Sequence, residues 1–358
     1  MKKERLTIER VAELAGVSIS TVSRVLNKTA PVSNELAARV KRVVEEYNYH
    51  PSQAARILSG TATSTICVLM NLEPEYHFRD YVSMETLRGI TSTAGLYGFQ
   101  VNIVIGSLEE VYRRFTSQRL VDGFIVLGLR ETERFLLEVE ATSLPIVLTN
   151  YCEEYRKFPS VSFAHKDNAY RLTNLMISKG HSHIDFIDFR RNLLYLENRK
   201  QGFLRAMREA ELETRCDTVL EVEGLDEHEA GKEAALKYLE LPVKPTALMA
   251  PSDNVALSCM TTLASHGVRI PEEVSITGVD DIPLAAFANP PLTTEALDGC
   301  ARGRQATEML IEILSGQRLR RRHIFIHSEI TQRDTLGEVT GRSTAGLVSP
   351  FRHAADER

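Results

Sequence analysis

Three short helical segments are predicted at the start of the chain, where apolar residues recur every three to four positions. The first is expected to end at Gly16, because glycine suits the left-handed turn that follows a helix. Ser18 can cap the second helix, since its hydroxyl can accept a hydrogen bond from a backbone N–H of the first turn. We expect an all-α headpiece over residues 1–50, with helices at 8–15, 19–27 and 34–47.

From residue 64 onward, short apolar runs typical of strands alternate with longer helical segments. Such alternation indicates parallel sheets that are covered by helices on both faces. A stretch of about 270 residues exceeds a typical single domain, so two doubly wound lobes are expected. The expected strands are 65–70, 100–105, 123–127, 146–148, 160–162, 183–187, 218–222, 247–249 and 274–279, and the expected helices include 84–96, 167–179, 199–210, 227–239 and 254–266.

The second predicted helix carries side chains that suit DNA reading. Ala15 allows the first two helices to pack closely, and Val17 and Val22 can close their core. Short polar side chains and one arginine on the outer side suit a helix in the major groove, where Arg24 can grip guanine. The alternative is a small helical hairpin with a solvated face. The candidate DNA-contacting residues are Thr7, Ser18, Ile19, Ser20, Thr21, Ser23, Arg24 and Asn27.

Several ordered motifs resemble the lactose-repressor/galactose-repressor (LacI/GalR) family of transcription regulators. VAELAGVSISTVSRVLN at 11–27 and VSNELAARVKRVVEEYNYHPSQAARIL at 32–58 are similar to its DNA-binding headpiece. The likeness continues through VDGFIV at 121–126, GHSHIDFI at 180–187, RKQGF at 199–203, PSDNVAL at 251–257, GVRIPEEVSITGVDD at 267–281 and PPLTT at 290–294. Glu9-Arg10 and Asn34-Glu35-Leu36 depart from the family pattern.

This resemblance implies an α/β fold in which an all-α helix-turn-helix headpiece precedes a two-lobed, doubly wound domain similar to type I periplasmic sugar-binding proteins. It implies a hinge helix at 51–60 and an effector-binding and dimerisation domain at 61–340. The first lobe is expected at about 61–160 and 291–325, and the second at about 161–290 and 326–340, with crossovers near 160, 290 and 325. We expect the polar tail at 341–358 to be disordered.

The resemblance also assigns DNA contacts to the hinge. Ala55 would lie along the floor of the minor groove, and Leu58 would wedge between base steps and kink the duplex. Because an isolated helix this short does not form in water, the resemblance implies that it folds only on operator DNA in a dimer. The residues alone favour a flexible linker with an incidental leucine.

By the same resemblance, a small molecule binds between the lobes at the carboxyl ends of the strands. Arg199 can donate several hydrogen bonds, and Asp280 can accept them from paired hydroxyl groups. A polar set with few aromatic residues favours a sugar or sugar derivative over an amino acid or a purine. The candidate ligand-binding residues are Glu75, His77, Phe78, Asn150, Phe163, Arg199, Ser252 and Asp280.

Alternatives stay open for several polar residues. Arg199 can instead pair with a structural carboxylate, and His77 can be a solvated loop residue. Asp253 is expected to cap the following helix, and Asp281 to be structural or exposed. Consecutive helical residues point in different directions, so the acidic cluster at 226–229 is expected to be a solvated helix start and not a metal site.

Charge and cysteine usage agree with this interpretation. Residues 1–60 hold ten Lys/Arg against six Asp/Glu, and the remaining residues hold 33 against 42. A basic head on an acidic body fits a small nucleic-acid contact surface. The five cysteines are scattered without zinc or disulfide spacing, which indicates buried thiols in a reducing cytoplasm.

The sequence therefore predicts a cytoplasmic, sequence-specific transcription regulator, expected to be a repressor. Its predicted partners are double-stranded operator DNA, a small-molecule effector and a second copy of the chain. Signal-peptide, membrane-span, enzyme and metal motifs are not found, so no membrane partner, catalytic activity or cofactor is expected. The alternatives are a family member that responds to a non-sugar effector or a partner protein, and a periplasmic-type sugar-binding protein, which would have a signal peptide and no headpiece.

Overall fold

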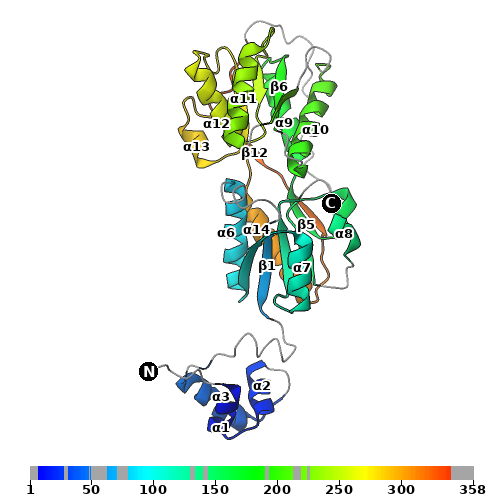
Figure 1. The fold of residues 1–358 in the computed structure, drawn as a ribbon, viewed down its shortest axis with the longest axis vertical. Helices are drawn as coiled ribbons and strands as arrows, with labels where there is room; N and C mark the ends of the chain where they lie inside the picture. The colour runs from blue at the N-terminus through cyan, green and yellow to red at the C-terminus, as the bar shows by residue number, and fades with distance from the viewer. Residues whose placement is uncertain are drawn as a thin grey trace, which may run out of the picture.

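The computed structural model describes residues 7–27, 31–47, 49, 63–70, 80–129, 134–139, 144–189, 193–212, 219–223 and 226–339. These residues form a small helical headpiece and two α/β lobes (Figure 1). The expected hinge at 51–60, the candidate ligand residues Glu75, His77 and Phe78, and the tail at 341–358 lie outside the described residues.

The headpiece forms as predicted, with three helices in its described part: α1 (Ile8–Ala15), α2 (Ile19–Asn27) and α3 (Asn34–Glu46). The Thr7 side chain caps α1, and Ser18 Oγ accepts a hydrogen bond from Thr21 N at 3.2 Å at the start of α2. Gly16 turns the chain between them at φ +62°, a conformation that favours glycine. The shared core consists of Val11, Ala12, Ala15, Val22, Val40, Val43 and Tyr49.

The first lobe is a parallel sheet between two helical layers, with the described strands in the order β11-β5-β4-β3-β1-β2. Its strands are β1 (Thr65–Met70), β2 (Gln100–Ile105), β3 (Gly123–Leu127), β4 (Ile146–Leu148), β5 (Ser160–Phe163) and β11 (His323–Ile326). Its helices are α6 (Tyr81–Leu96), α7 (Leu108–Ser117), α8 (Arg134–Glu138) and α14 (Gly299–Leu314), and a short 3-10 helix spans Glu153–Tyr155.

Strand β1 explains why both faces of this sheet are covered. Successive side chains of a strand point to opposite faces, and every side chain of β1 is apolar or buried. Cys67 and Leu69 pack in the cluster that includes α7 and α8. Ile66, Val68 and Met70 pack in the cluster that includes α6 and α14. The continuous apolar run in the sequence therefore indicates a strand buried between two layers, as predicted.

The second lobe repeats this plan, with the described strands in the order β12-β10-β9-β8-β6-β7 and only β12 antiparallel to its neighbour. The strands are β6 (Ile184–Phe189), β7 (Val219–Val222), β8 (Ala247–Met249), β9 (Ser275–Asp280), β10 (Thr293–Ala296) and β12 (Glu329–Thr331). The helices are α9 (His165–Ser178), α10 (Leu194–Glu209), α11 (Glu227–Glu240), α12 (Asp253–Ser265) and α13 (Pro283–Phe287). Helices α9 and α10 share one core with this sheet, and α11 and α12 share the other.

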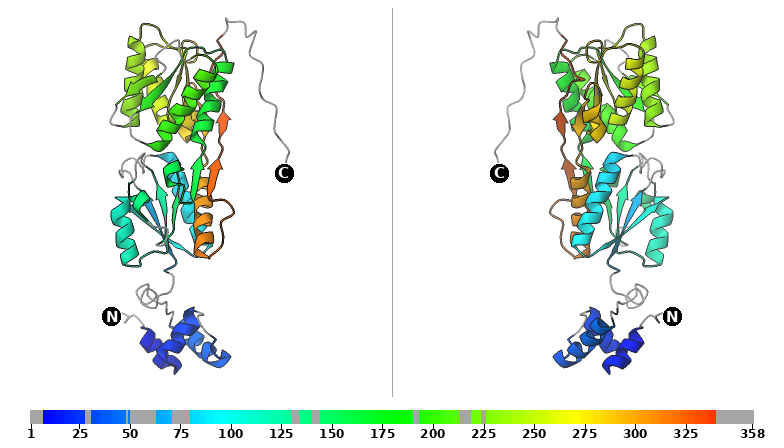
Figure 2. Two further views of the ribbon diagram at one scale, coloured as in Figure 1. Left: turned by 90° about the vertical axis from the view of Figure 1, so that its right-hand side faces the viewer. Right: turned by 90° about the vertical axis from the view of Figure 1, so that its left-hand side faces the viewer.

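The crossovers between the lobes lie later in the chain than expected. Strand β5 pairs with β4 and β11, so the first lobe continues beyond residue 160 to Phe163. Strand β10 pairs with β9, so the second lobe continues beyond residue 290 to Ala296. The third crossover consists of His327 and Ser328 between β11 and β12, which Figure 2 shows as consecutive orange strands in the two lobes. Strand pairing sets these boundaries, whereas the prolines near 159 and 290 lie before them.

Helices α6 and α14 approach each other closely, and this contact was not predicted because α14 was not singled out as a helix. A Cβ at Gly303 would lie 2.0 Å from the backbone oxygen of Thr86, so only glycine allows this spacing. The close approach places Arg302 of α14 directly against Thr86 of α6. This contact positions one of the charged side chains of the site described below.

Candidate functional site

One pocket is lined by residues of both lobes. Its walls follow the carboxyl ends of strands, the usual location of ligand sites in open α/β sheets. The first lobe contributes Asp80, Val82, Ser83, Leu127, Gly128, Asn150, Phe163 and Arg302, the second contributes His165, Tyr195, Arg199, Glu227, Ser252 and Asp280, and Leu297 follows the second crossover.

The ligand candidates that the structure describes all line this pocket. Asn150 follows β4, Phe163 ends β5, Ser252 follows β8 and Asp280 ends β9. Arg199 comes from α10, although it lies in the second turn and not at the helix start as expected, because α10 begins at Leu194. Strand ends far apart in the sequence thus bring a donor, two acceptors, an aromatic ring and a hydroxyl to one place.

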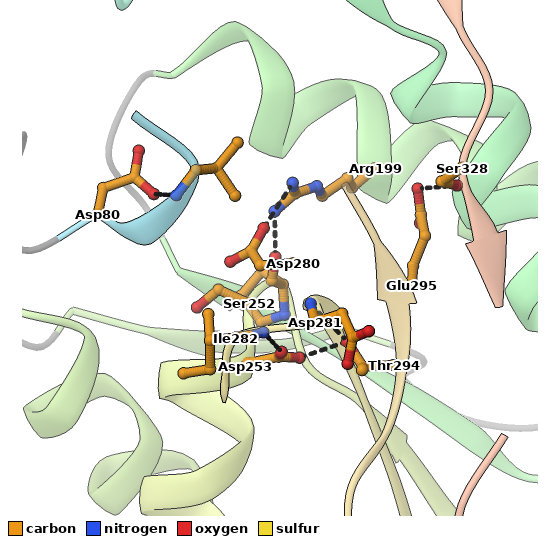
Figure 3. A network of polar contacts seen from close by, with 12 residues as sticks. Asp80, Arg199, Ser252, Asp253, Asp280, Asp281, Ile282, Thr294, Glu295 and Ser328 are labelled. Carbon is orange, nitrogen blue, oxygen red and sulfur yellow. Dashed lines mark hydrogen bonds and ion pairs between the residues drawn. The ribbon is translucent and has the colours of Figure 1, made fainter. Parts of the chain in front are cut away.

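Arg199 and Asp280 contact each other at the centre of this pocket (Figure 3). Arg199 Nη2 donates to Asp280 Oδ1 at 3.3 Å, and a second nitrogen donates to the backbone oxygen of Pro251. The guanidinium also lies over the ring of Tyr195, 4.9 Å from its centroid. Arg199 therefore does pair with a carboxylate, but that carboxylate is the other candidate for ligand recognition.

The backbone at Asp280 is strained, with φ +125° in a region that side chains other than glycine rarely adopt. The strain occurs where β9 ends, and it directs the carboxylate toward Arg199 (Figure 3). Strained residues concentrate at ligand sites, where the surrounding structure maintains an otherwise unfavourable conformation.

Ser252 and Glu227 correct two expectations. Ser252, and not Asp253, caps α12, because its Oγ accepts from Val255 N. Ser252 Oγ also donates to Glu227 Oε1 at 2.7 Å, and Asn254 Nδ2 donates to Glu227 Oε2 at 2.9 Å. The acidic cluster at 226–229 is therefore not a wholly solvated helix start, since Glu227 turns into the pocket.

Asp253 and Asp281 support the site from behind. Asp253 Oδ2 accepts from Ile282 N at 2.9 Å, and its Oδ1 accepts from Thr294 Oγ1 at 2.5 Å (Figure 3). Asp281 forms an ion pair with Arg333 at 2.7 Å, as expected for a structural residue. These bonds connect α12, β10 and the end of β9, and thereby hold the turn that carries Asp280.

Sequence reasoning missed Asp80, His165, Tyr195 and Arg302 as pocket residues. Their positions before α6, at the start of α9, in the first turn of α10 and in α14 become adjacent only through the lobe arrangement. For Glu227 the acidic cluster was a visible signal, but its direction depended on the packing of α11 against α12. The other residues had no signal in the sequence.

Burial controls protonation in this pocket. It raises the pKa of Asp280 well above its usual range, although the charge of Arg199 opposes this effect. Burial likewise raises the pKa of Glu227. It lowers the pKa of His165 well below its ordinary value, and the charges of Arg199 and Arg302 add to this effect, so the imidazole is neutral.

The candidate DNA-contacting side chains gather on α2 and at its start. Ser18, Ile19, Ser20 and Arg24 are exposed, and Ser23 is half-buried. Ser18 Oγ lies 2.8 Å from both Ser20 Oγ and Thr21 Oγ1, which arranges these hydroxyls at the start of the helix. Thr7 is occupied as the cap of α1, and the side chain of Asn27 lies outside the described residues.

Family models match two parts of the chain. Residues 7–52 match "Bacterial regulatory proteins, lacI family", and residues 173–336 match "Periplasmic binding protein-like domain". The HTH-type transcriptional repressor PurR of Vibrio cholerae is 32% identical over 93% of this chain and 99% of its own length. The chain belongs to the lacI family. It is a DNA-binding transcription regulator with the headpiece and two-lobed α/β domain of that family.

Solved structures of the lacI family share its fold. The Lac repressor dimer bound to operator and the anti-inducer ONPF matches 93% of this chain with a TM-score of 0.79 at 24% identity. The transcriptional regulator CelR in its cellobiose complex matches 92% with a TM-score of 0.70 at 24% identity.

Within the part of the chain that the structure describes, no helix has the length and apolar character needed to cross a membrane. Among the same residues, no group of three or more His, Cys, Asp and Glu side chains is arranged to hold a metal ion.

The buried Asp253 predicts a specific pH dependence of stability. Burial raises its pKa to about 7 from an ordinary value of 3.8, so the folded state binds this proton more tightly than the unfolded state. Its contribution to stability is then fully present below about pH 4 and lost as pH rises through about 7. We expect Asp253→Asn, which cannot ionise, to lose less stability than the wild type between pH 5 and pH 8.

Denaturant unfolding at the two pH values measures this difference. Asp167→Asn is the matched control, because Asp167 is an exposed carboxylate of the same lobe and should retain the wild-type pH dependence. An Asp253→Asn variant with the wild-type pH dependence would contradict the prediction.

Proposed function

We propose that this regulator is a cytoplasmic repressor that binds operator DNA as a homodimer and is controlled by a small hydroxylated molecule in the pocket between its lobes. The observation that carries this proposal is the arrangement of Arg199 and Asp280. A guanidinium donor and a carboxylate acceptor lie side by side in a pocket lined by both lobes. Sugar hydroxyl groups both donate and accept hydrogen bonds, so they can engage both side chains.

The coupling to DNA follows from the two-lobed pocket. A ligand that contacts both lobes binds one lobe angle better than another, and it shifts the equilibrium by that difference in affinity. In a dimer, a changed lobe angle alters the spacing of the two hinge segments at 51–60. In this proposal, the spacing decides whether Leu58 can enter the minor groove and Ala55 can lie along its floor.

Exposed apolar side chains support the dimer. Leu96 at the end of α6 is 85% exposed, and Leu284 and Phe287 of α13 are 63% and 83% exposed. Helices α6 and α13 lie on the same side of the molecule in different lobes (Figure 1). Large apolar side chains in contact with water along both lobes are typical of a protein–protein interface.

The chemistry of the pocket, and not family membership, must indicate the class of effector. The relatives at about 32% identity bear the name PurR, whereas a similar structure holds cellobiose. In this chain, carboxylate, amide and hydroxyl groups outnumber aromatic rings at the pocket wall. This composition favours a hydroxylated compound over a flat purine base.

Arg24 is predicted to read a base edge. Arg24→Ala should weaken binding to an operator selected from random DNA by about 1–3 kcal/mol and relax the preference at one base pair. Electrophoretic mobility shifts with single-base operator variants measure both effects. Arg42→Ala removes an exposed arginine from α3 and should leave base preference unchanged. An unaltered preference in the Arg24 variant would remove its base-reading role.

Phe287 is predicted to lie in the dimer interface. Phe287→Asp places a charge on this apolar surface, and we expect monomers in sedimentation velocity at micromolar concentration. Val243→Asp provides a control, because Val243 is 69% exposed but belongs to the loop between α11 and β8. A dimer that persists in the Phe287 variant contradicts this choice of surface.

Effector control is tested by operator affinity in the presence of sugars, sugar acids and purine bases. At least one hydroxylated compound should change wild-type affinity, and Asp280→Asn should abolish the response because an amide NH₂ replaces one oxygen of the carboxyl group. Loss of a hydrogen bond weakens ligand binding by roughly tenfold to a hundredfold. Glu272→Gln, at an exposed carboxylate outside the pocket, should respond like the wild type. If no compound changes the operator affinity of the wild type, the proposed function is wrong.

A further inference from the structure

Arg302 carries a buried charge that has no ion-pair partner among the described residues. The residue is 6% exposed, and it lines the pocket from α14. Its Nε and Nη2 donate to Thr86 Oγ1 at 3.1 and 2.7 Å, and its guanidinium lies 4.6 Å from the centroid of the Phe163 ring. Among the described residues these are its polar and ring partners, and no carboxylate forms an ion pair with it.

The hydroxyl of Thr86 cannot replace an anion. It is neutral, and it already donates its own hydrogen to the backbone oxygen of Val82 at 2.7 Å. Removing a guanidinium from water is unfavourable unless an anion compensates for the lost hydration. The burial of Arg302 lowers its pKa to about 10, which still leaves it positively charged at neutral pH.

The carboxylates of the pocket are each engaged elsewhere. Asp280 accepts from Arg199 at 3.3 Å, and Glu227 accepts from Ser252 and Asn254. Asp80 caps α6 by accepting from two backbone N–H groups of its first turn. The charge of Asp80 favours the charged form of Arg302, but among the described residues no carboxylate forms an ion pair with Arg302.

His165 provides a second, independent sign of a missing ligand. Its side chain is buried at the start of α9 and lines the pocket, yet among the described residues neither ring nitrogen has a hydrogen-bond partner. A neutral imidazole has one donor and one acceptor nitrogen, and leaving both unsatisfied is costly. Its ring centroid lies 5.6 Å from that of Phe163, the ring that Arg302 also covers.

We propose that the effector carries a carboxylate that binds Arg302, so that the effector is a sugar acid and not a neutral sugar. The planar guanidinium matches a carboxylate with two parallel hydrogen bonds. The remaining hydroxyl groups of the effector bind His165, Asp280 and their neighbours. This assignment rests on the proposed function, because it specifies the chemical class of molecule that occupies the same pocket.

A carboxylate fits this pocket better than a phosphate. Burial raises the pKa of Glu227 and Asp280, which line the same cavity, so the cavity disfavours negative charge and a second charge on the ligand would be unfavourable. A single negative charge is sufficient to pair with Arg302, since Arg199 already has Asp280 as a partner. The same carboxylates can accept hydrogen bonds from hydroxyl groups, which a sugar acid supplies in number.

The first experiment changes the ligand and leaves the protein intact. The wild-type protein is titrated by calorimetry with D-gluconate, D-glucuronate and D-galacturonate, with the neutral partners D-glucose, D-galactose and D-glucuronamide, and with glucose 6-phosphate, hypoxanthine and guanine. Operator affinity is measured with each compound. We expect one of the acids to bind, to alter operator affinity, and to bind roughly tenfold to a hundredfold more tightly than its neutral partner.

The second experiment changes Arg302. Arg302→Met removes the charge and should eliminate the preference for the acid over its neutral partner. Arg302→Lys keeps the charge but loses the planar fork, and should retain part of the preference. Arg304→Met is the matched control, because Arg304 is exposed on the same helix and does not line the pocket. The rescue by lysine separates a charge effect from a general loss of structure.

Several outcomes overturn the assignment. These are equal affinity for an acid and its amide, tighter binding of glucose 6-phosphate than of any sugar acid, and an undiminished preference for the acid in Arg302→Met. If only a neutral sugar or a purine base changes operator affinity, the assignment of a carboxylate to the effector is wrong and the proposed function remains. If no compound changes operator affinity, both the carboxylate assignment and the proposed function are wrong.

Discussion

Burial of charged side chains between two lobes is the constraint on which the pocket depends. A guanidinium or carboxylate removed from water is stable only with a partner, so each charge restricts the positions of its neighbours. Arg199 satisfies this requirement within the second lobe through Asp280, and the strained turn at Asp280 is maintained by the bonds of Asp253 behind it. Arg302 approaches from the first lobe, and among the described residues its hydrogen-bond partner is the neutral hydroxyl of Thr86. In the described part of the pocket, the arginine of the second lobe therefore has an ion-pair partner and the arginine of the first lobe has none.

Strand β1 determines where the chain enters the first lobe. The polypeptide enters the first lobe through β1, which lies inside the sheet between β2 and β3. Asp122 fixes the start of this strand, because its carboxylate accepts from Thr63 N at 2.7 Å and from Thr63 Oγ1 at 3.0 Å. Rotation of the first lobe as a rigid body therefore moves residue 63 with it, and residue 63 follows the expected hinge segment directly.

The hydrophobic pattern of the sequence did not predict the crossovers between the lobes accurately. Apolar runs predicted the strands up to β9 well, because a strand buried on both faces has a distinctive composition. The pattern did not indicate β10, β11 and β12, and of these β10 and β12 carry polar residues such as Thr293, Glu295 and Glu329. Glu295 is buried nonetheless, and it accepts from Ser328 Oγ at 2.6 Å across two crossovers (Figure 3). Polar residues that bond to one another at the crossovers are invisible to a criterion based on hydrophobicity, so the expected boundaries fell too early.

The sequence by itself determined the headpiece, the two-lobed class and the ligand candidates that follow strands. Helical period, capping residues and the glycine turn are local properties, and residues after parallel strands must meet at one edge of a sheet. Only the tertiary structure decided which charges have partners. Glu227 turned inward because α11 packs against α12, and Arg302 reached the pocket because Gly303 allows α14 to approach α6. The electrostatic balance of the pocket depends on distances between residues from separate lobes, and such distances are set by packing and not by neighbours along the chain.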